Sequence, residues 1–300
     1  MERSVNSVEY DSIARQKLIE TLCGKYGFIK KITIGKSCFG KPITALKIGS
    51  ASQYALITAA FHGSERITSN VLLMFLEELA EAIQKNEYIA GINARRALKG
   101  RGIIFVPCVN PDGCDISLLG KTACGNKAEE FAKLCKNDFN KWNANARGVD
   151  INHNFDAGWE KLRRAERSNG IYGPSPTRFG GYKPESEPET IALANLCRRV
   201  EIRHVTALHS QGEVIYWNYG KTEPPRSRKM AEIMATSSGY AMDVPFGLAV
   251  GGGFKDWFIE EFSRPGFTVE IGKGENPLPI ETAESIYIKI REMLILCSIM

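Results

Sequence analysis

Three side chains of metal-binding types stand out in this sequence: His62, Glu65 and, far downstream, His209. Two ligands on one tight turn cannot hold a metal ion alone, so a third ligand must come from another segment. A catalytic zinc site typically takes three nitrogen or oxygen ligands from the protein and leaves the fourth position to water, whose pKa it lowers to about 7. The three residues therefore predict a zinc site that activates water.

The pair His62 and Glu65 depends on its surroundings for this interpretation. With 4 histidines and 34 acidic residues in 300, a His-x-x-acid match arises by chance about 0.45 times. Residues 55–61 form an apolar run of strand length, and residues 205–208 have the same character just before His209. Both histidines are thus expected at the carboxyl ends of buried strands, where α/β sheets bind their ligands.

The elements that must position these residues alternate along the chain. Strands are predicted near 29–34, 43–48, 54–61, 102–109, 205–208, 214–217 and 266–271. Helices are predicted near 12–23, 68–85, 128–135, 187–200, 226–238, 254–262 and 282–296. This alternation indicates an α/β fold with a mixed parallel and antiparallel sheet and helices on both faces. The stretch 170–188 is the longest expected loop.

We expect one domain over 1–300, with the chemistry-bearing core at about 54–272, a helix and strands in 1–50, and a terminal helix in 281–300. The composition, 43% hydrophobic and 24% charged, is that of an ordinary globular chain. No apolar run approaches the roughly 18 residues of a membrane span, and the first residues lack the pattern of a secretory signal. The expectation is a cytoplasmic protein without membrane contact.

The charge and the cysteines narrow the class further. A net charge of +5 is mild and fits a small acidic substrate, but it lacks the clustered basic stripe of a nucleic-acid binder. The 8 cysteines are scattered and contain no Cys-x-x-Cys pair, which favours reduced structural thiols over a disulfide framework.

Four further segments carry side chains suited to catalysis. They are Asn110-Pro-Asp-Gly113, a turn after a strand; the span 145–155, with a guanidinium, a carboxylate and amides; the glycine run 251–253 before a helix; and 267–272, where Glu270 is the one acid in an apolar strand. An unpaired acid in such a strand is costly unless it is used, which favours Glu270 as a functional group.

These segments resemble the M14 zinc carboxypeptidase family, in the order that the family shows. The matching motifs are His62-x-x-Glu65, Asn110-Pro-Asp-Gly113, Arg147-Gly-Val-Asp150-x-Asn152, His209-Ser210, Gly252-Gly-x-x-Asp256-Trp257 and Phe267-Thr-Val-Glu270. Within the family, the stretches 142–150 and 209–217 look most like bacterial γ-D-glutamyl-diamino acid peptidases, which cut peptidoglycan stem peptides.

The resemblance implies a role for each matched residue. One Zn²⁺ ion would be held by His62, Glu65 and His209, and Asp150 would accept a hydrogen bond from the far nitrogen of His62, although it could also be only a turn or cap residue. Glu270 would take a proton from the attacking water and pass it to the leaving amine. Arg147 would stabilise the oxyanion, from a backbone segment shorter than in the digestive enzymes.

Two departures from the family bear on the substrate. Ordinary carboxypeptidases have an Asn-Arg pair where this chain has Asn152-His153, and imidazole cannot reproduce the arginine's bidentate grip on a terminal carboxylate. Lys255 stands at the family's side-chain pocket, where it would pair with a distal carboxylate such as that of meso-diaminopimelate; the alternative is a solvated lysine at a helix start. Gln211 is a further predicted substrate contact.

Two other residues complete the expectations. The family's mobile tyrosine is missing, with Leu248 and Val250 nearby, and Tyr240 is a possible replacement. His204 is expected to be a structural or surface histidine, because it lies five residues before His209 and so on the other strand face.

The sequence thus predicts a zinc metallopeptidase that hydrolyses an amide bond in a small acidic peptide or muropeptide, with the γ-D-glutamyl-diaminopimelate link as the favoured substrate. Two alternatives stay open at this point. One is a metallocarboxypeptidase for ordinary L-peptides. The other is a non-catalytic protein of the same fold that binds wall fragments, against which the intact Glu270 argues.

Overall fold

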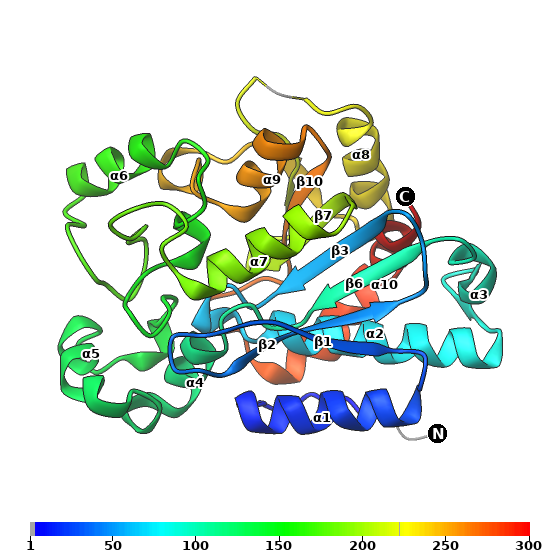
Figure 1. The fold of residues 1–300 in the computed structure, drawn as a ribbon, viewed down its shortest axis with the longest axis horizontal. Coiled ribbons are helices and arrows are strands. Elements are labelled where there is room, and N and C mark those ends of the chain that lie inside the picture. The colour runs from blue at the N-terminus through cyan, green and yellow to red at the C-terminus, as the bar shows by residue number, and fades with distance from the viewer. Residues whose placement is uncertain (1–3, 222) are drawn as a thin grey trace.

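A single twisted sheet runs through the computed structural model, which describes residues 4–221 and 223–300 (Figure 1). Residues 1–3 and 222, which fall within the predicted domain, lie outside the described residues. The sheet consists of β1 (Lys30–Lys36), β2 (Pro42–Ile48), β3 (Tyr54–Ala59), β6 (Gly102–Val106), β7 (Ile202–His209), β8 (Val214–Tyr216), β9 (Ala241–Asp243) and β10 (Gly266–Glu270). Its spatial order is β1-β2-β6-β3-β7-β10-β8-β9, and β4 (Tyr88–Ile89) and β5 (Ile92–Asn93) form a separate pair.

The centre of the sheet is parallel and its flanks are partly antiparallel. Strands β6, β3, β7 and β10 run in parallel, whereas β1 with β2, β2 with β6, and β10 with β8 are antiparallel. All six residues of β3 are buried. A strand that is apolar on both faces needs cover on both faces, which is the usual arrangement of parallel sheets.

Helices supply this cover on both faces, as predicted. They are α1 (Ser12–Lys25), α2 (Ile67–Lys85), α3 (Ala94–Ala97), α4 (Pro111–Leu119), α5 (Ala128–Leu134), α6 (Trp159–Ser168), α7 (Pro188–Arg199), α8 (Ser227–Ser238), α9 (Phe254–Phe262) and α10 (Ala283–Ile299). One apolar core joins α1, α2, α8 and α10 to the sheet, and a second joins α7 and α9 to its other face. Helix α7 lies in front of the strands in Figure 1, with α2 and α10 behind them.

Three helices were missed by the sequence analysis, the single turn α3 and the longer α4 and α6. The segment interpreted as a turn at Asn110 begins α4, because the Asn110 side chain accepts a hydrogen bond from Gly113 N (2.9 Å) and Pro111 occupies the first helical turn. Helix α6 is rich in glutamate, lysine and arginine, and only Trp159, Leu162 and Ala165 form its apolar face, which is too few residues for the pattern to stand out in the sequence. The long loop between α6 and α7 is where it was expected.

The carboxyl ends of the central strands meet at one edge of the sheet. Ala59 of β3 pairs with Leu208 of β7, and His209 of β7 pairs with Glu270 of β10. Paired residues of parallel neighbours point to the same face, so His209 and Glu270 project together. The described residues contain no helix with both the length and the apolar character that a membrane crossing requires.

Candidate active site

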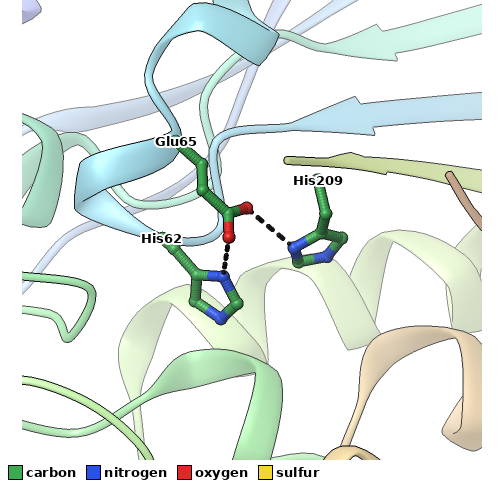
Figure 2. Close-up of side chains that lie close together, drawn as sticks. All are labelled: His62, Glu65 and His209. Carbon is green, nitrogen blue, oxygen red and sulfur yellow. Dashed lines mark hydrogen bonds and ion pairs between the residues drawn. The ribbon is translucent and has the colours of Figure 1, made fainter. Parts of the chain in front are cut away.

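The three predicted metal ligands converge at this edge (Figure 2). Glu65 Oε1 lies 2.8 Å from His62 Nδ1, and Glu65 Oε2 lies 3.0 Å from His209 Nδ1. His62 and Glu65 come from the turn between β3 and α2, whereas His209 is the last residue of β7. The ring nitrogens that face the carboxylate are the Nδ1 atoms of both histidines, so one small cation between them would meet all three side chains.

The turn that carries His62 and Glu65 is packed against backbone from two other segments. A Cβ atom on Gly63 would lie 2.2 Å from Gly113 O and 2.4 Å from Trp142 O, so only glycine fits there. Asn110 Nδ2 donates to the carbonyl oxygen of Phe61 at 2.9 Å, directly before His62. The Phe61 ring stacks on His209 with 5.0 Å between ring centroids, which orients the third ligand.

Two carboxylates surround the His62 ring. Asp150 Oδ1 lies 3.1 Å from His62 Nε2, opposite the nitrogen that faces Glu65, and Asp150 Oδ2 accepts a hydrogen bond from Arg178 N at 2.9 Å. Burial by itself lowers the pKa of His62, but the charges of Glu65 and Asp150 outweigh it and raise that pKa well above its ordinary value. The site therefore favours positive charge.

These residues fit a zinc ion. The donors are two imidazole nitrogens and a carboxylate, the set typical of catalytic zinc in peptidases. Burial raises the pKa of Glu65, yet the charges of His62 and His209 lower it to about 2, which keeps the group in its metal-binding form at neutral pH. Asp150 supplies the outer acceptor that metal-bound histidines usually have, because it would fix the ring through Nε2–H.

Glu270 lies in the same pocket as the ligands. A cavity of ≈ 140 Å³ is lined by both ligand histidines and by Glu270. Burial and the negative charge of Glu65 raise the pKa of Glu270 to about 8, against the opposing effect of His62. A cation at the three ligands would lower this value, so Glu270 is placed to exchange protons near neutral pH.

The cavity also contains the predicted substrate residues Asn152, His153 and Lys255. Lys255 is buried, and its Nζ donates to Asn218 O at 2.6 Å and pairs with the Asp256 carboxylate. An ammonium has three N–H donors, so one remains for a ligand. Lys255 is thus not a solvated helix residue, although Asp256 offsets its charge.

The comparisons with known proteins agree with this geometry. Residues 16–293 match the zinc carboxypeptidase family, peptidase M14. The chain belongs to this family. It is 37% identical over 291 residues to γ-D-glutamyl-L-diamino acid endopeptidase 1 of Lysinibacillus sphaericus, covering 95% of this chain and 71% of the relative. It is 26% identical over 226 residues to murein peptide amidase A of Escherichia coli K12, covering 74% of each.

Solved structures show the same fold. The chain superposes on bovine thrombin-activatable fibrinolysis inhibitor, solved in complex with tick carboxypeptidase inhibitor, with a TM-score of 0.76 at 21% identity and 97% coverage of both chains. Murein-tripeptide amidase of Escherichia coli O157 gives a TM-score of 0.56 at 23% identity, with 88% of this chain and 91% of that chain covered. With the family and the peptidase relatives, this chain is a zinc metallopeptidase of the carboxypeptidase fold.

Among the residues predicted for catalysis and substrate binding, Arg147 and Gln211 do not line the metal cavity. Arg147 borders a separate pocket, and its guanidinium, on a side chain that is 53% exposed, lies 3.7 Å from Glu187. Asn145 Oδ1 accepts from the backbone N–H groups of Arg147 and Val149, a turn that the motif spacing did not reveal. Gln211 is exposed. The roles of Arg147 and Gln211 stay predictions. The Arg147 side chain is half exposed and its contact with the buried Glu187 is long, so the guanidinium can change partners at little cost.

The structure also settles where the two tyrosines of interest lie. Tyr240 is buried, and its hydroxyl accepts a hydrogen bond from Gly272 N, so it does not replace the family's mobile tyrosine in the cavity. Tyr216, which the sequence analysis missed, lines the cavity and pairs with Thr268 on the neighbouring strand. Its signal was available: it lies two residues after Val214, the partner of Glu270, and strand residues two apart share a face.

Proposed function

We propose that this zinc metallopeptidase hydrolyses the γ-D-glutamyl-diaminopimelate link of peptidoglycan stem peptides, with one Zn²⁺ ion at His62, Glu65 and His209. The observation that carries the proposal is the buried Lys255 ammonium in the cavity that is also lined by the two ligand histidines and Glu270. A buried donor with a positive charge favours a substrate carboxylate beside the scissile bond. The relatives from Lysinibacillus sphaericus and Escherichia coli, a γ-D-glutamyl-L-diamino acid endopeptidase and a murein peptide amidase, support the same substrate class.

In this proposal the residues of the chain share the chemistry. Zinc, when bound, supplies a Lewis acid for the scissile carbonyl and an open coordination position. Glu270 accepts the proton of the attacking water and delivers it to the leaving amine, a task suited to a group whose pKa burial has raised toward neutrality. Asp150 holds the His62 ring, and Asn152, His153 and Lys255 hold the acidic substrate in the cavity.

A pair of substrates that differ in one carboxylate tests the proposal. The zinc-loaded protein is assayed on L-Ala-γ-D-Glu-meso-diaminopimelate and on the same peptide with L-lysine as its last residue, which lacks the distal carboxylate. We expect cleavage after γ-D-Glu and a kcat/KM about tenfold or more higher for the diaminopimelate peptide. Lys255→Met should shrink that ratio, whereas Lys221→Met, at an exposed lysine, should leave it unchanged.

Two results would point to the alternatives. Faster release of a plain C-terminal L-residue than of diaminopimelate would make the protein an ordinary metallocarboxypeptidase. Binding of zinc and of the muropeptide without turnover would make it a wall-fragment-binding protein of the same fold.

A further inference from the structure

A buried group of three charged or titratable side chains lies behind the substrate cavity. His153 lines the cavity, and its Nδ1 lies 2.8 Å from Glu166 Oε1. Glu166 sits on α6 with no exposed surface, and its other oxygen, Oε2, accepts from Arg163 Nη1 and from Gly180 N (3.1 Å). Arg163 is buried as well and lies over the Phe179 ring, 4.6 Å from its centroid.

The hydrogen bonds within this group decide which ring nitrogen of His153 is left for a ligand in the cavity. A carboxylate that already faces a guanidinium and a backbone N–H offers only acceptor atoms, so the hydrogen between Glu166 and His153 belongs to Nδ1. The second nitrogen, Nε2, is then the one left for a ligand. A carboxylate on Nδ1–H fixes the orientation and the tautomer of the ring, as in other His-carboxylate pairs.

We infer that Glu166, held in place by Arg163, is a positioning residue that orients His153 so that Nε2–H of the imidazolium donates to a carboxylate of the substrate. The inference rests on the proposed function, because the acid it would hold is the diamino acid after the scissile bond. His153, held by Glu166 and Arg163, then provides one of the two hydrogen bonds that a single arginine gives to a substrate carboxylate in ordinary carboxypeptidases. Asp150 also interacts with this ring through its charge, because burial raises the pKa of the Asp150 carboxyl and the charges of His62 and then His153 lower it.

The ring state can be measured without turnover. The chain has 4 histidines, so ¹⁵N-histidine NMR of the zinc-loaded protein is tractable, and His153→Gln assigns the His153 signals. We expect His153 to carry its hydrogen on Nδ1 in the free protein and on both nitrogens after meso-diaminopimelate is added. A free-protein signal with the hydrogen on Nε2, or no change with meso-diaminopimelate, would overturn the inference.

Kinetics test the positioning role separately. Glu166→Gln keeps an acceptor for Nδ1–H but removes the charge, so we expect KM for the diaminopimelate peptide to rise about tenfold with kcat changed much less and zinc content intact. Glu160→Gln on the exposed side of the same helix is the matched control and should leave KM unchanged. An equal KM in both variants would overturn the inference.

The remaining outcomes are also decisive. Glu166→Gln leaves Arg163 without its buried partner; if it does not fold, the double variant Arg163→Met with Glu166→Gln removes both charges and should show the same rise in KM. If the wild type cleaves no stem peptide but the NMR states are as expected and Glu166→Gln loses meso-diaminopimelate binding, the proposed function fails while the role of Glu166 holds.

Discussion

For Glu270 and Asp150, the residue type and its position in the sequence already indicated which side chains would lie nearby. Glu270 is an acid at the end of an apolar strand, and its place beside His209 follows from one register pair between β10 and β7. Asp150 was expected to be either a turn residue or a partner of His62. It is both: Oδ1 accepts from Asn152 N at 3.2 Å and lies 3.1 Å from His62 Nε2.

Replacing Glu270 with glutamine should remove the proton acceptor and leave the ligands in place. We expect kcat to fall by about 10²–10⁴-fold, as for the loss of a general base, with zinc content unchanged by elemental analysis. Glu281→Gln, at an exposed glutamate, is the control. Full activity in Glu270→Gln would contradict the mechanism without touching the fold.

The change Asp150→Asn should weaken zinc binding. The amide can still accept from the backbone, but it lacks the charge that holds Nε2–H of His62, so zinc affinity should fall by about 10–100-fold. Competition with a chelator of known affinity measures this loss, and Asp138→Asn, in a more exposed turn, serves as the comparison. An unchanged affinity would mean that Asp150 only shapes the turn.

The turn between β3 and α2 depends on elements far from it in the sequence. Gly63 N donates a hydrogen bond to Asn143 O at 3.1 Å, and the side-chain amide of Asn110, at the start of α4, donates one to the carbonyl oxygen of Phe61. The glycine in this turn is required by the close approach of the Gly113 and Trp142 carbonyls, not by its own backbone angles. Sequence spacing indicated the candidate ligands on the turn but not the backbone against which the turn packs.

Gly63→Ala should therefore displace the ligands. A Cβ atom at 2.2 Å and 2.4 Å from two carbonyl oxygens cannot be accommodated without moving backbone, so we expect loss of zinc binding together with lower thermal stability. Gly24→Ala, where a Cβ would meet nothing within 4 Å, should bind zinc normally. Isothermal titration of both variants with zinc compares them, and equal affinities would refute the packing argument.

At the scale of the whole molecule, the two apolar cores share one sheet. This arrangement is what the prediction of one domain over 1–300 requires, and that prediction would give a single cooperative unfolding transition. His204 belongs to this packing: it lies on β7 and its Nε2 donates to Cys297 O of α10 at 2.7 Å, on the face opposite the metal ligands. The prediction of a structural histidine is confirmed.

His204 should make stability depend on pH. Burial and the charge of Arg203 lower its pKa to about 3, whereas an unfolded histidine titrates near 6.5. Between these values the unfolded state binds the extra proton, so the free energy of unfolding falls as the pH falls, by up to about 1.4 kcal/mol per pH unit. Above about pH 6.5 His204 is neutral in both the folded and the unfolded state, so it no longer lowers the free energy of unfolding.

Denaturant unfolding of the wild type and of His204→Gln from pH 4.5 to 8 measures that dependence. Subtracting the two profiles cancels the other titrating groups, including the metal ligands, so the difference should be constant above about pH 7 and shrink below about pH 6. A difference that does not change with pH would show that His204 does not titrate as inferred.

The sequence by itself determined the alternation of strands and helices and the family, and it named the candidate metal ligands and Glu270, because these depend on residue types, local periodicity and motif order. Only the tertiary structure decided that Arg147 faces Glu187, that Asp256 pairs with Lys255, and that Glu166 and Arg163 stand behind His153. The physical reason is that a side chain's partner is set by which distant segments the sheet and its helices bring into contact. Spacing along the chain carries no record of that contact.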